Sequence, residues 1–412
     1  MKRFNVLILL VLLSVGAMFA DGGLNSPYTR YGFGQLASME TGTSKGMGGT
    51  GIGVHNSNQI NMLNPASYAA VDTLTFLLDV GMSISNTNLN QDGVKMNSGS
   101  ASFDYLAMQF RLVPRLGMTL GMTPFSNIGY DFSETKPVYN NEDGQITATN
   151  RYLGAGGLRQ ITAGLGYMFF KGLSAGANFS YTYGEVYHYV YNQYNDASIS
   201  SRVRQYRADI RTYNIDLGVQ YHFTVGKERF TFGATYRPGH KITSDAHIIE
   251  TISANDTVSR HSMSIPSAYG VGFSYTHDNR LTIAADYSMQ QYGNVDFFGE
   301  KGADCYRASL GVEYVPEHFT RNLFRRARYR AGVYCATSHY EIKGEQGPTE
   351  YGATIGVGLP IMNRWNGKSI VNISGQYVHV RPRVPGMIVE NSLRLNIGLS
   401  FNETWFNKWR VQ

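Results

Sequence analysis

The chain has 412 residues, of which 16% are charged and 13% are aromatic, and it contains 46 glycines and 29 tyrosines. The charged fraction is below the roughly 25% of ordinary soluble domains, and this composition favours strands over helices. The net charge of +6 is spread along the chain without a basic helix or an aromatic stacking platform, so we predict no nucleic-acid partner.

The first twenty residues have the pattern of a secretory signal peptide. Lys2 and Arg3 precede an apolar run over 6–15, and small residues follow it. We therefore expect export and cleavage near Asp21. Beyond residue 20 no apolar stretch reaches the roughly 18 residues that a spanning helix needs, so a helical membrane protein is excluded.

Residues 21–72 lack strand alternation and are rich in glycine, serine and asparagine. We predict that they form a hatch inside a barrel. Gly48 and Gly51 lie in a stretch with the pattern of a dinucleotide-binding loop, but no strand precedes it and no helix follows it. We therefore assign both glycines to the hatch and predict no cofactor.

From about residue 73 the sequence alternates between apolar and polar residues. One run has Leu173, Ala175, Ala177, Phe179 and Tyr181 on one face and small polar residues or glycine on the other. Such runs approach the 9–11 residues that a transmembrane strand needs and exceed the typical strand of a soluble sandwich. Tyrosines gather at the ends of the runs, as in the aromatic girdles of membrane barrels.

We count about fourteen such runs, which begin near residues 73, 99, 115, 157, 172, 205, 228, 265, 280, 303, 327, 349, 368 and 390. An even number is typical of bacterial outer-membrane barrels, in which short turns lie in the periplasm and longer loops lie outside. We therefore predict an all-β transmembrane antiparallel barrel over 73–402 and a periplasmic tail over 403–412.

Two stretches resemble the FadL-like family of outer-membrane transporters for long-chain fatty acids and other hydrophobic compounds. The first is 60–66, which ends in Asn64, Pro65 and Ala66, and the second is 116–125 in strand three. The resemblance implies a fourteen-stranded barrel with an N-terminal hatch in its lumen. We expect the Asn-Pro-Ala turn to anchor this hatch, with an ordinary loop end as the alternative.

Strand three contains Pro124, and a proline within a sheet is confined to an edge, a first residue or a bulge. A closed barrel has no edge, so we predict a bulge within 122–127. Such a bulge would open a lateral gate formed by Thr123, Pro124, Phe125 and Asn127. The alternative is that Pro124 lies just above the membrane, where the strand frays into its outer loop.

Strand two is ambiguous about which of its faces points outward. We assign Leu106, Met108 and Phe110 to the lumen together with Phe125, although Phe103, Tyr105 and Ala107 compete for the outward face. Apolar residues in the lumen favour a channel for hydrophobic compounds, because a general porin would line its channel with charge.

We predict no catalytic site and no metal site. Neither a Gly-x-Ser-x-Gly elbow nor a His-Glu-x-x-His motif occurs. His240, His247 and His261 fall in one expected outer loop, but their spacing matches no common ligand set. Cys305 and Cys335 lie on neighbouring strands, where we place Cys305 inward and Cys335 outward, so we expect both to stay unpaired.

The leading functional hypothesis is passive uptake of a hydrophobic or amphipathic small molecule, such as a long-chain fatty acid, across the outer membrane. Its partners would be outer-membrane lipids and the hydrophobic ligand. The alternative is a non-transporting barrel that serves as a subunit of an outer-membrane secretion or assembly complex. A third hypothesis, a nonspecific porin, predicts ion conductance, which a plugged lumen would prevent.

Overall fold

The computed structural model describes residues 26–404, except 74, 142–143, 197, 253–254, 298–299, 319, 321 and 362–367. The expected signal peptide over 1–20 and the tail from 405 onward lie outside the described residues. Thr75 and Thr404, where the barrel begins and ends, pair with each other at one end of the barrel. We call this end the inner end and the opposite end the outer end, following the expected periplasmic position of both termini.

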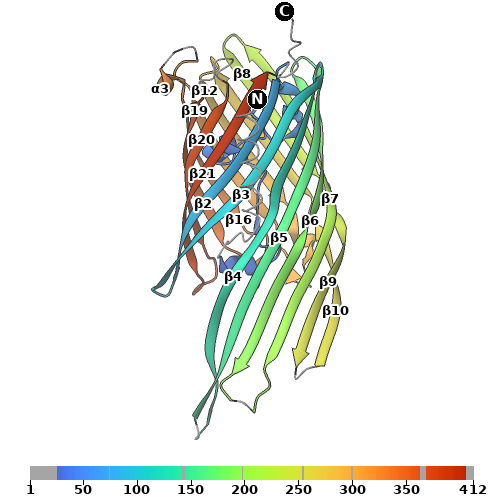
Figure 1. Cartoon of the computed structure of the whole chain (residues 1–412), viewed down its shortest axis with the longest axis vertical. Coiled ribbons are helices and arrows are strands. Elements are labelled where there is room, and N and C mark those ends of the chain that lie inside the picture. The colour runs from blue at the N-terminus through green and yellow to red at the C-terminus, as the bar shows by residue number, and fades with distance from the viewer. Residues whose placement is uncertain are drawn as a thin grey trace, which may run out of the picture.

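Fourteen antiparallel strands form the barrel (Figure 1). They are β2 (Thr75–Gln91), β3 (Val94–Val113), β4 (Leu116–Asn141), β5 (Gly144–Phe170), β6 (Leu173–Tyr194), β7 (Arg202–Val225), β8 (Glu228–Arg237), β11 (Ala268–His277), β12 (Leu281–Gln290), β15 (Cys305–Tyr314), β16 (Arg328–Thr337), β19 (Thr349–Pro360), β20 (Ile370–Arg381) and β21 (Val389–Thr404). β21 pairs with β2 and closes the barrel. The predicted strand number and fold class are confirmed.

Side chains alternate between the lumen and the outside of the barrel. On β6, Phe179 and Tyr181 are 55% and 45% exposed, whereas Ser180 and Thr182 are buried. A polar lumen and an apolar outer belt are the inverse of a soluble barrel and identify a barrel that spans a bilayer. Among the described residues, no helix has the length and apolar character required to cross a membrane.

The outer end differs from the expected set of long loops. β2 and β3 are joined by a tight turn at Asp92 and Gly93, and β4 to β7 continue as strands of 22 to 27 residues. These strands are far longer than a bilayer requires. Because polar and charged residues interrupt the apolar face in their outer halves, the apolar period weakens in the sequence although the strands continue.

The expected outer loop between β8 and β11 is a hairpin of β9 (His240–Ile252) and β10 (Asn255–Ile265). β7 pairs with β8 at its inner part and with β9 at its outer part. β4 to β7 therefore join β9 and β10 in a curved sheet that projects beyond the rest of the barrel (Figure 1). His240 lies on this hairpin, where it shares a 2.7 Å hydrogen bond with Thr212.

The remaining elements are short. The hatch contains η1 (Pro27–Arg30), β1 (Gln35–Leu36), α2 (Gly42–Gly46) and η2 (Pro65–Ala70). The barrel connections contain η3 (Tyr292–Asn294), β13 (Asp296–Phe297), β14 (Glu300–Lys301), α3 (Leu323–Arg326), β17 (Glu341–Ile342) and β18 (Glu345–Gln346).

The assignment of the faces of β3 was wrong. Tyr105, Ala107 and Gln109 are at most 2% exposed and face the lumen, so Leu106, Met108 and Phe110 face outward. The cause is a bulge: Gly81 faces Tyr105 while Met82 faces Phe103, which leaves Asp104 as an extra residue. A bulge shifts the alternation by one residue, so a strict period of two cannot assign both halves of the strand.

The two cysteines do not form a disulfide, as predicted. Cys305 is buried on the lumen side. Cys335 shares the outward face of β16 with Val333, which is 52% exposed. Both cysteines are free.

Candidate functional site: the seat of the hatch and a lateral opening

The Asn-Pro-Ala turn lies inside the lumen and fastens the hatch to β7. Asn64 is completely buried, and its side-chain amide donates hydrogen bonds to the carbonyls of Ile52 at 2.9 Å and Val219 at 3.2 Å. Its side-chain oxygen accepts a hydrogen bond from the backbone N–H of Ala66 at 3.1 Å. Pro65 is the first residue of η2, a position where its missing N–H costs nothing.

Glycines in the barrel wall make room for this turn. A Cβ atom at Gly218 would lie 2.1 Å from the Asn64 side-chain oxygen, and Cβ atoms at Gly166 and Gly176 would lie 2.6 and 2.4 Å from the Pro65 carbonyl. The backbone of the hatch therefore approaches the wall more closely than any other residue would allow. Glycine at lumen-facing strand positions was the sequence signal for this contact.

The other two predicted hatch residues, Gly48 and Gly51, contact other strands of the wall, β16 and β12. Gly48 has a positive φ of 69°, and a Cβ there would lie 2.9 Å from the backbone of Val333 on β16. The backbone N–H groups of Gly51 and Ile52 donate hydrogen bonds to the Asp286 carboxylate on β12, at 2.6 and 2.8 Å. The glycine-rich stretch is thus a turn that follows α2 and rests against the barrel.

Two ion pairs also join the hatch to the wall. Glu40 lies 2.9 Å from Arg307 on β15, and Lys45 lies 2.7 Å from Asp104 in the bulge of β3. Burial alone would raise the pKa of Glu40, but the Arg307 guanidinium holds it below its usual value. Sequence reasoning missed these residues, although a charge at a lumen-facing position such as Arg307 was a signal for a partner in the hatch.

The wall has a discontinuity between β3 and β4. Their pairing runs from Val113 and Leu116 at the inner end only as far as Leu106 and Met122. Beyond that point β3 pairs with β2, and β4 pairs with β5. The outer part of β4 therefore has an edge that the neighbouring barrel strand does not cover.

The hatch occupies this edge of β4. In β1, Gln35 is paired with Asn127 and Leu36 with Ser126. The backbone N–H of Ala37 donates to the carbonyl of Phe125 at 3.0 Å. A short hatch strand thus satisfies backbone groups that would otherwise be unpaired at an open strand edge.

The expected bulge in strand three lies at Phe125. The register of β4 and β5 shifts between Pro124 and Ser126, and β4 then continues to Asn141 instead of fraying. Thr123 and Phe125 are both buried, and Thr123 accepts a 2.9 Å hydrogen bond from the Gln160 side chain. The structure therefore places Thr123 and Phe125 on the buried side of the wall, and Asn127 meets the hatch through its pairing with Gln35.

A cavity of about 470 Å³ lies between the hatch and the barrel and reaches this discontinuity. Its lining includes Phe103 of β3, Phe125 of β4 and Leu36 of the hatch. It also includes charged groups, among them Glu40 and Arg394. The cavity therefore combines apolar and charged surface.

Comparison with known protein families assigns this chain to one of them. The BamG family model matches residues 1–412, which is the whole chain. The chain belongs to the BamG family. No curated protein sequence matches it significantly.

Solved structures similar to this BamG-family chain share its fold. A Pseudomonas aeruginosa FadL homologue is 12% identical with a TM-score of 0.61, covering 90% of this chain and 99% of the other. The Pseudomonas putida toluene transporter TodX is 15% identical with a TM-score of 0.57, covering 90% and 100%. The CymD monoaromatic hydrocarbon channel is 14% identical with a TM-score of 0.57, covering 92% and 100%.

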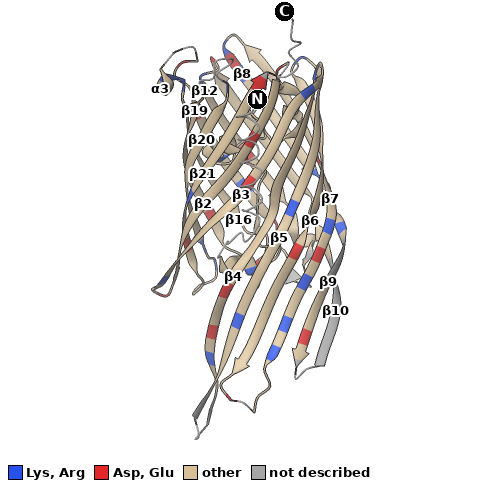
Figure 2. Cartoon of the chain, viewed as in Figure 1, with Lys and Arg blue, Asp and Glu red and all other residues tan. Residues whose placement is uncertain are grey.

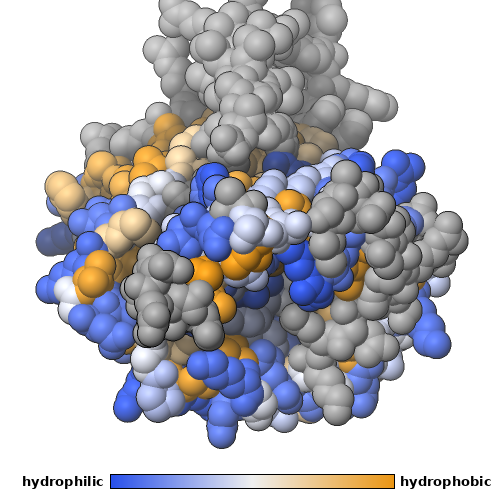
Figure 3. All heavy atoms as spheres, turned by 90° about the horizontal axis from the view of Figure 1, so that it is seen from below, coloured by the Kyte–Doolittle hydropathy of each residue, from blue (hydrophilic) through white to orange (hydrophobic). Residues whose placement is uncertain are grey.

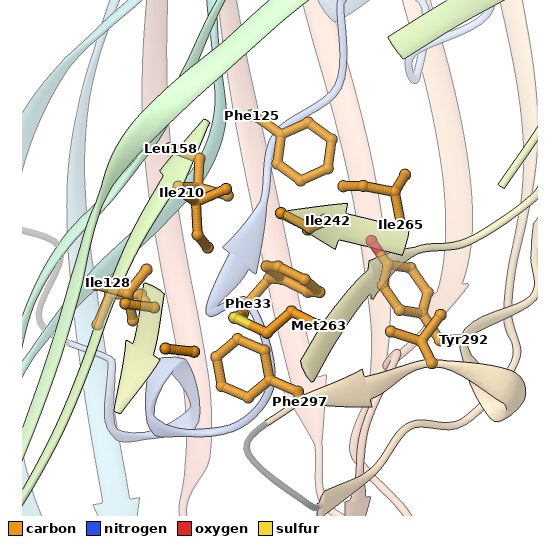
Figure 4. Close-up of a cluster of buried hydrophobic side chains, with 14 of the residues drawn as sticks. Phe33, Phe125, Ile128, Leu158, Ile210, Ile242, Met263, Ile265, Tyr292 and Phe297 are labelled. Carbon is orange, nitrogen blue, oxygen red and sulfur yellow. The ribbon is translucent and has the colours of Figure 1, made fainter. Parts of the chain in front are cut away.

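The BamG-family barrel carries an apolar cluster toward its outer end. Phe33 of the hatch is 1% exposed, and its ring lies 4.8 Å from Phe297, 6.2 Å from Tyr292 and 6.4 Å from Phe125 (Figure 4). Residues of β4 to β7, β9 and β10 complete this cluster. Seen from the outer end, hydrophobic surface shows at the edge of a hollow with a largely hydrophilic rim (Figure 3).

Proposed function

We propose that this chain is an outer-membrane barrel that takes up a hydrophobic or amphipathic small molecule passively and releases it sideways between β3 and β4. The observation that carries the proposal is the end of β3–β4 pairing at Leu106 and Met122, next to a cavity of about 470 Å³. A ligand in this cavity would reach the bilayer once the short hatch strand β1 leaves the edge of β4, without displacement of the rest of the hatch.

The direct route along the barrel axis is obstructed. The cluster around Phe33 lies in the lumen toward the outer end, and the hatch is held to β7 by Asn64 and to β12 by the Asp286 contacts. Sideways movement requires the release of fewer contacts, because β1 makes only a two-residue pairing with the edge of β4. Its release would uncover Phe125 and the gap beside it.

The composition of the cavity favours an amphipathic ligand, such as a long-chain fatty acid. Phe103, Phe125 and Leu36 would contact an acyl chain, whereas charged and hydroxyl groups are available for a polar head. The related folds are named as a toluene transporter and a monoaromatic hydrocarbon channel, and such smaller ligands are the competing class to test.

The experiment locks β1 to β4. Leu36 and Ser126 are directly paired, so a Leu36→Cys/Ser126→Cys disulfide should fix the hatch strand to the gate. Cys305→Ala and Cys335→Ala remove the native thiols. We expect uptake of oleate into whole cells to fall at least tenfold under oxidation and to recover on reduction. Full uptake by the oxidised variant would contradict the lateral route.

The matched control is a disulfide elsewhere in the wall. Thr276 and Thr282 are paired across β11 and β12, with hydroxyls 3.2 Å apart. A Thr276→Cys/Thr282→Cys disulfide should leave uptake unchanged. In a separate variant, Pro124→Val gives β4 a backbone N–H at the bulge, and we expect reduced uptake without loss of heat stability.

The second candidate is a non-transporting subunit of an outer-membrane secretion or assembly complex. The projecting sheet of β4 to β7 with β9 and β10 favours it, because uptake through the wall does not require strands this long. Copurification from native membranes distinguishes the two. A stoichiometric protein partner with unchanged oleate uptake in a deletion strain would support the subunit over the transporter.

A further inference from the structure

The lipid-facing belt on β5 to β7 ends at a defined level. Ile161, Tyr181 and Tyr213 lie side by side on these three strands and are 52%, 45% and 50% exposed. On β7 the outward residues from Phe223 to Tyr213 are apolar or aromatic, a stretch close to the 9–11 residues that cross a bilayer. Tyr181 and Tyr213 therefore mark the outer interface.

Two arginines lie in the next row of outward residues. Arg159 of β5 is paired with Tyr183 of β6, which is paired with Arg211 of β7. Strands are about 4.8 Å apart, so the two arginines flank the tyrosine at a backbone separation of about 10 Å. Arg211 and Asp209 are 3.6 Å apart with exposed side chains, a weak contact that leaves guanidinium donors available.

Beyond the arginines, Glu185 of β6 is paired with Asp209 of β7 on the same outward face, and a column of tyrosines follows on β6. Tyr187, Tyr189 and Tyr191 alternate with residues that face inward. The rings of Tyr189 and Tyr191 are stacked at 6.0 Å, and Arg207 lies over the ring of Tyr187 at 5.3 Å. With ~3.3 Å per residue and a tilt of ~40°, the end of the column at Tyr191 lies about 25 Å above the end of the belt at Tyr181.

Figure 2 shows that charged residues gather on the projecting part of these strands, while the upper wall of the barrel carries few. The outward face of the projection is continuous with the lipid-facing belt. Its charges and tyrosines therefore lie beside the headgroups of the outer leaflet and away from the lumen.

We propose that the outward face of β5 to β7 binds a phosphorylated glycolipid of the outer leaflet. The acyl chains lie on the belt below Tyr181, and a phosphate lies between Arg159 and Arg211. The sugars extend along Tyr187 to Tyr191. Guanidinium groups bind phosphate oxygens in a bidentate manner, and flat aromatic rings pack against the C–H faces of sugars.

The distance that the site extends above the lipid-facing belt indicates which class of lipid binds there. A phospholipid headgroup would reach the two arginines but would leave the tyrosines beyond Tyr183 without a contact. A glycolipid with a sugar core contacts the belt, then the arginines, and then, beyond Glu185 and Asp209, the column, in the order in which they occur along β6. This inference does not depend on whether the barrel transports a ligand.

The test measures lipid retained by the full-length barrel in native mass spectrometry. The probes are rough lipopolysaccharide, the same lipid after dephosphorylation, and phosphatidylglycerol. We expect Arg159→Gln/Arg211→Gln to retain about tenfold less lipopolysaccharide than the parent chain. Arg325→Gln is the control, because this guanidinium is 63% exposed beside Glu317 near the inner end. Dephosphorylated lipid should bind the parent chain as weakly as lipopolysaccharide binds the double variant.

Tyr187→Ser/Tyr191→Ser tests the sugar contacts. It should weaken retention of lipopolysaccharide by severalfold and leave phosphatidylglycerol unchanged. Equal retention of lipopolysaccharide by the arginine variant and the parent chain, with both barrels folded by heat-modified gel migration, overturns the phosphate site. If the parent chain retains phosphatidylglycerol as well as it retains lipopolysaccharide, the site does not select a glycolipid and the proposed occupant is wrong.

Discussion

Arg307 on β15 lies 2.9 Å from Glu40 in the hatch, and the same guanidinium donates a 3.2 Å hydrogen bond to the carbonyl of Gly48. One side chain of the wall thus holds two points of the hatch. Because these groups are only partly exposed, their attraction is screened less than that of a surface pair.

The Glu40 contact should make hatch docking sensitive to acid. Arg307 and Lys45 hold the pKa of Glu40 below its usual value of 4.5 against the opposing effect of burial. A carboxyl with a lowered pKa contributes stability above its usual pKa and loses that contribution as the pH falls through the lowered value. We expect Glu40→Gln to weaken hatch docking by about 2 kcal/mol at pH 7.

Limited proteolysis of the hatch at pH 7 and below pH 4.5 measures this effect. The difference between the parent chain and Glu40→Gln should shrink as the pH falls, because protonation removes the same charge. A constant difference would show that the ion pair does not anchor the hatch.

Asn64→Leu should loosen the hatch from β7. The change removes donors to the carbonyls of Ile52 and Val219 in a completely buried site, at a cost of about 2–4 kcal/mol. Single-channel conductance in planar bilayers should rise together with protease cleavage within 26–72. Asn88→Leu, at a solvent-exposed hydrogen bond to Asn97, is the control and should change neither. Unchanged conductance in Asn64→Leu would favour an ordinary loop end.

Gly218→Ala should displace the hatch by steric overlap. The added Cβ would lie 2.1 Å from the Asn64 side-chain oxygen and 2.7 Å from Pro65 Cδ. At Gly375 the nearest atom to an added Cβ is 4.0 Å away, so Gly375→Ala is a matched strand control. We expect faster hydrogen exchange over 60–70 in Gly218→Ala alone. Equal exchange in both variants would show that the close approach is not required.

Phe33→Ala should open the cluster toward the outer end. Removing a ring that is 1% exposed leaves a cavity and costs about 3–5 kcal/mol. We expect cysteine-reactive reagents added from outside to reach Cys305, which belongs to the same cluster, more rapidly. Phe324→Ala, at a ring that is 70% exposed on α3, is the control. No change in the labelling rate would show that Phe33 does not close the route.

The sequence predicted the barrel part of the fold well. Alternation over runs of bilayer length gave the number of barrel strands, and starts such as 228, 281 and 349 lie at or beside the expected residues. Alternation failed where polar residues interrupt the apolar face, as in the outer part of β5, and at the bulge of Asp104. In both places the backbone pairing persists although the hydrophobic signal ends or shifts.

The sequence also singled out Asn64, through its resemblance to the FadL-like family, and Pro124, because a proline within a strand has few backbone solutions. Only the tertiary structure decided what these residues contact. Closure of the barrel brings Glu40 against Arg307 and Leu36 against Ser126 across long separations in the chain. The register of the strands sets such pairings, and no local pattern encodes them.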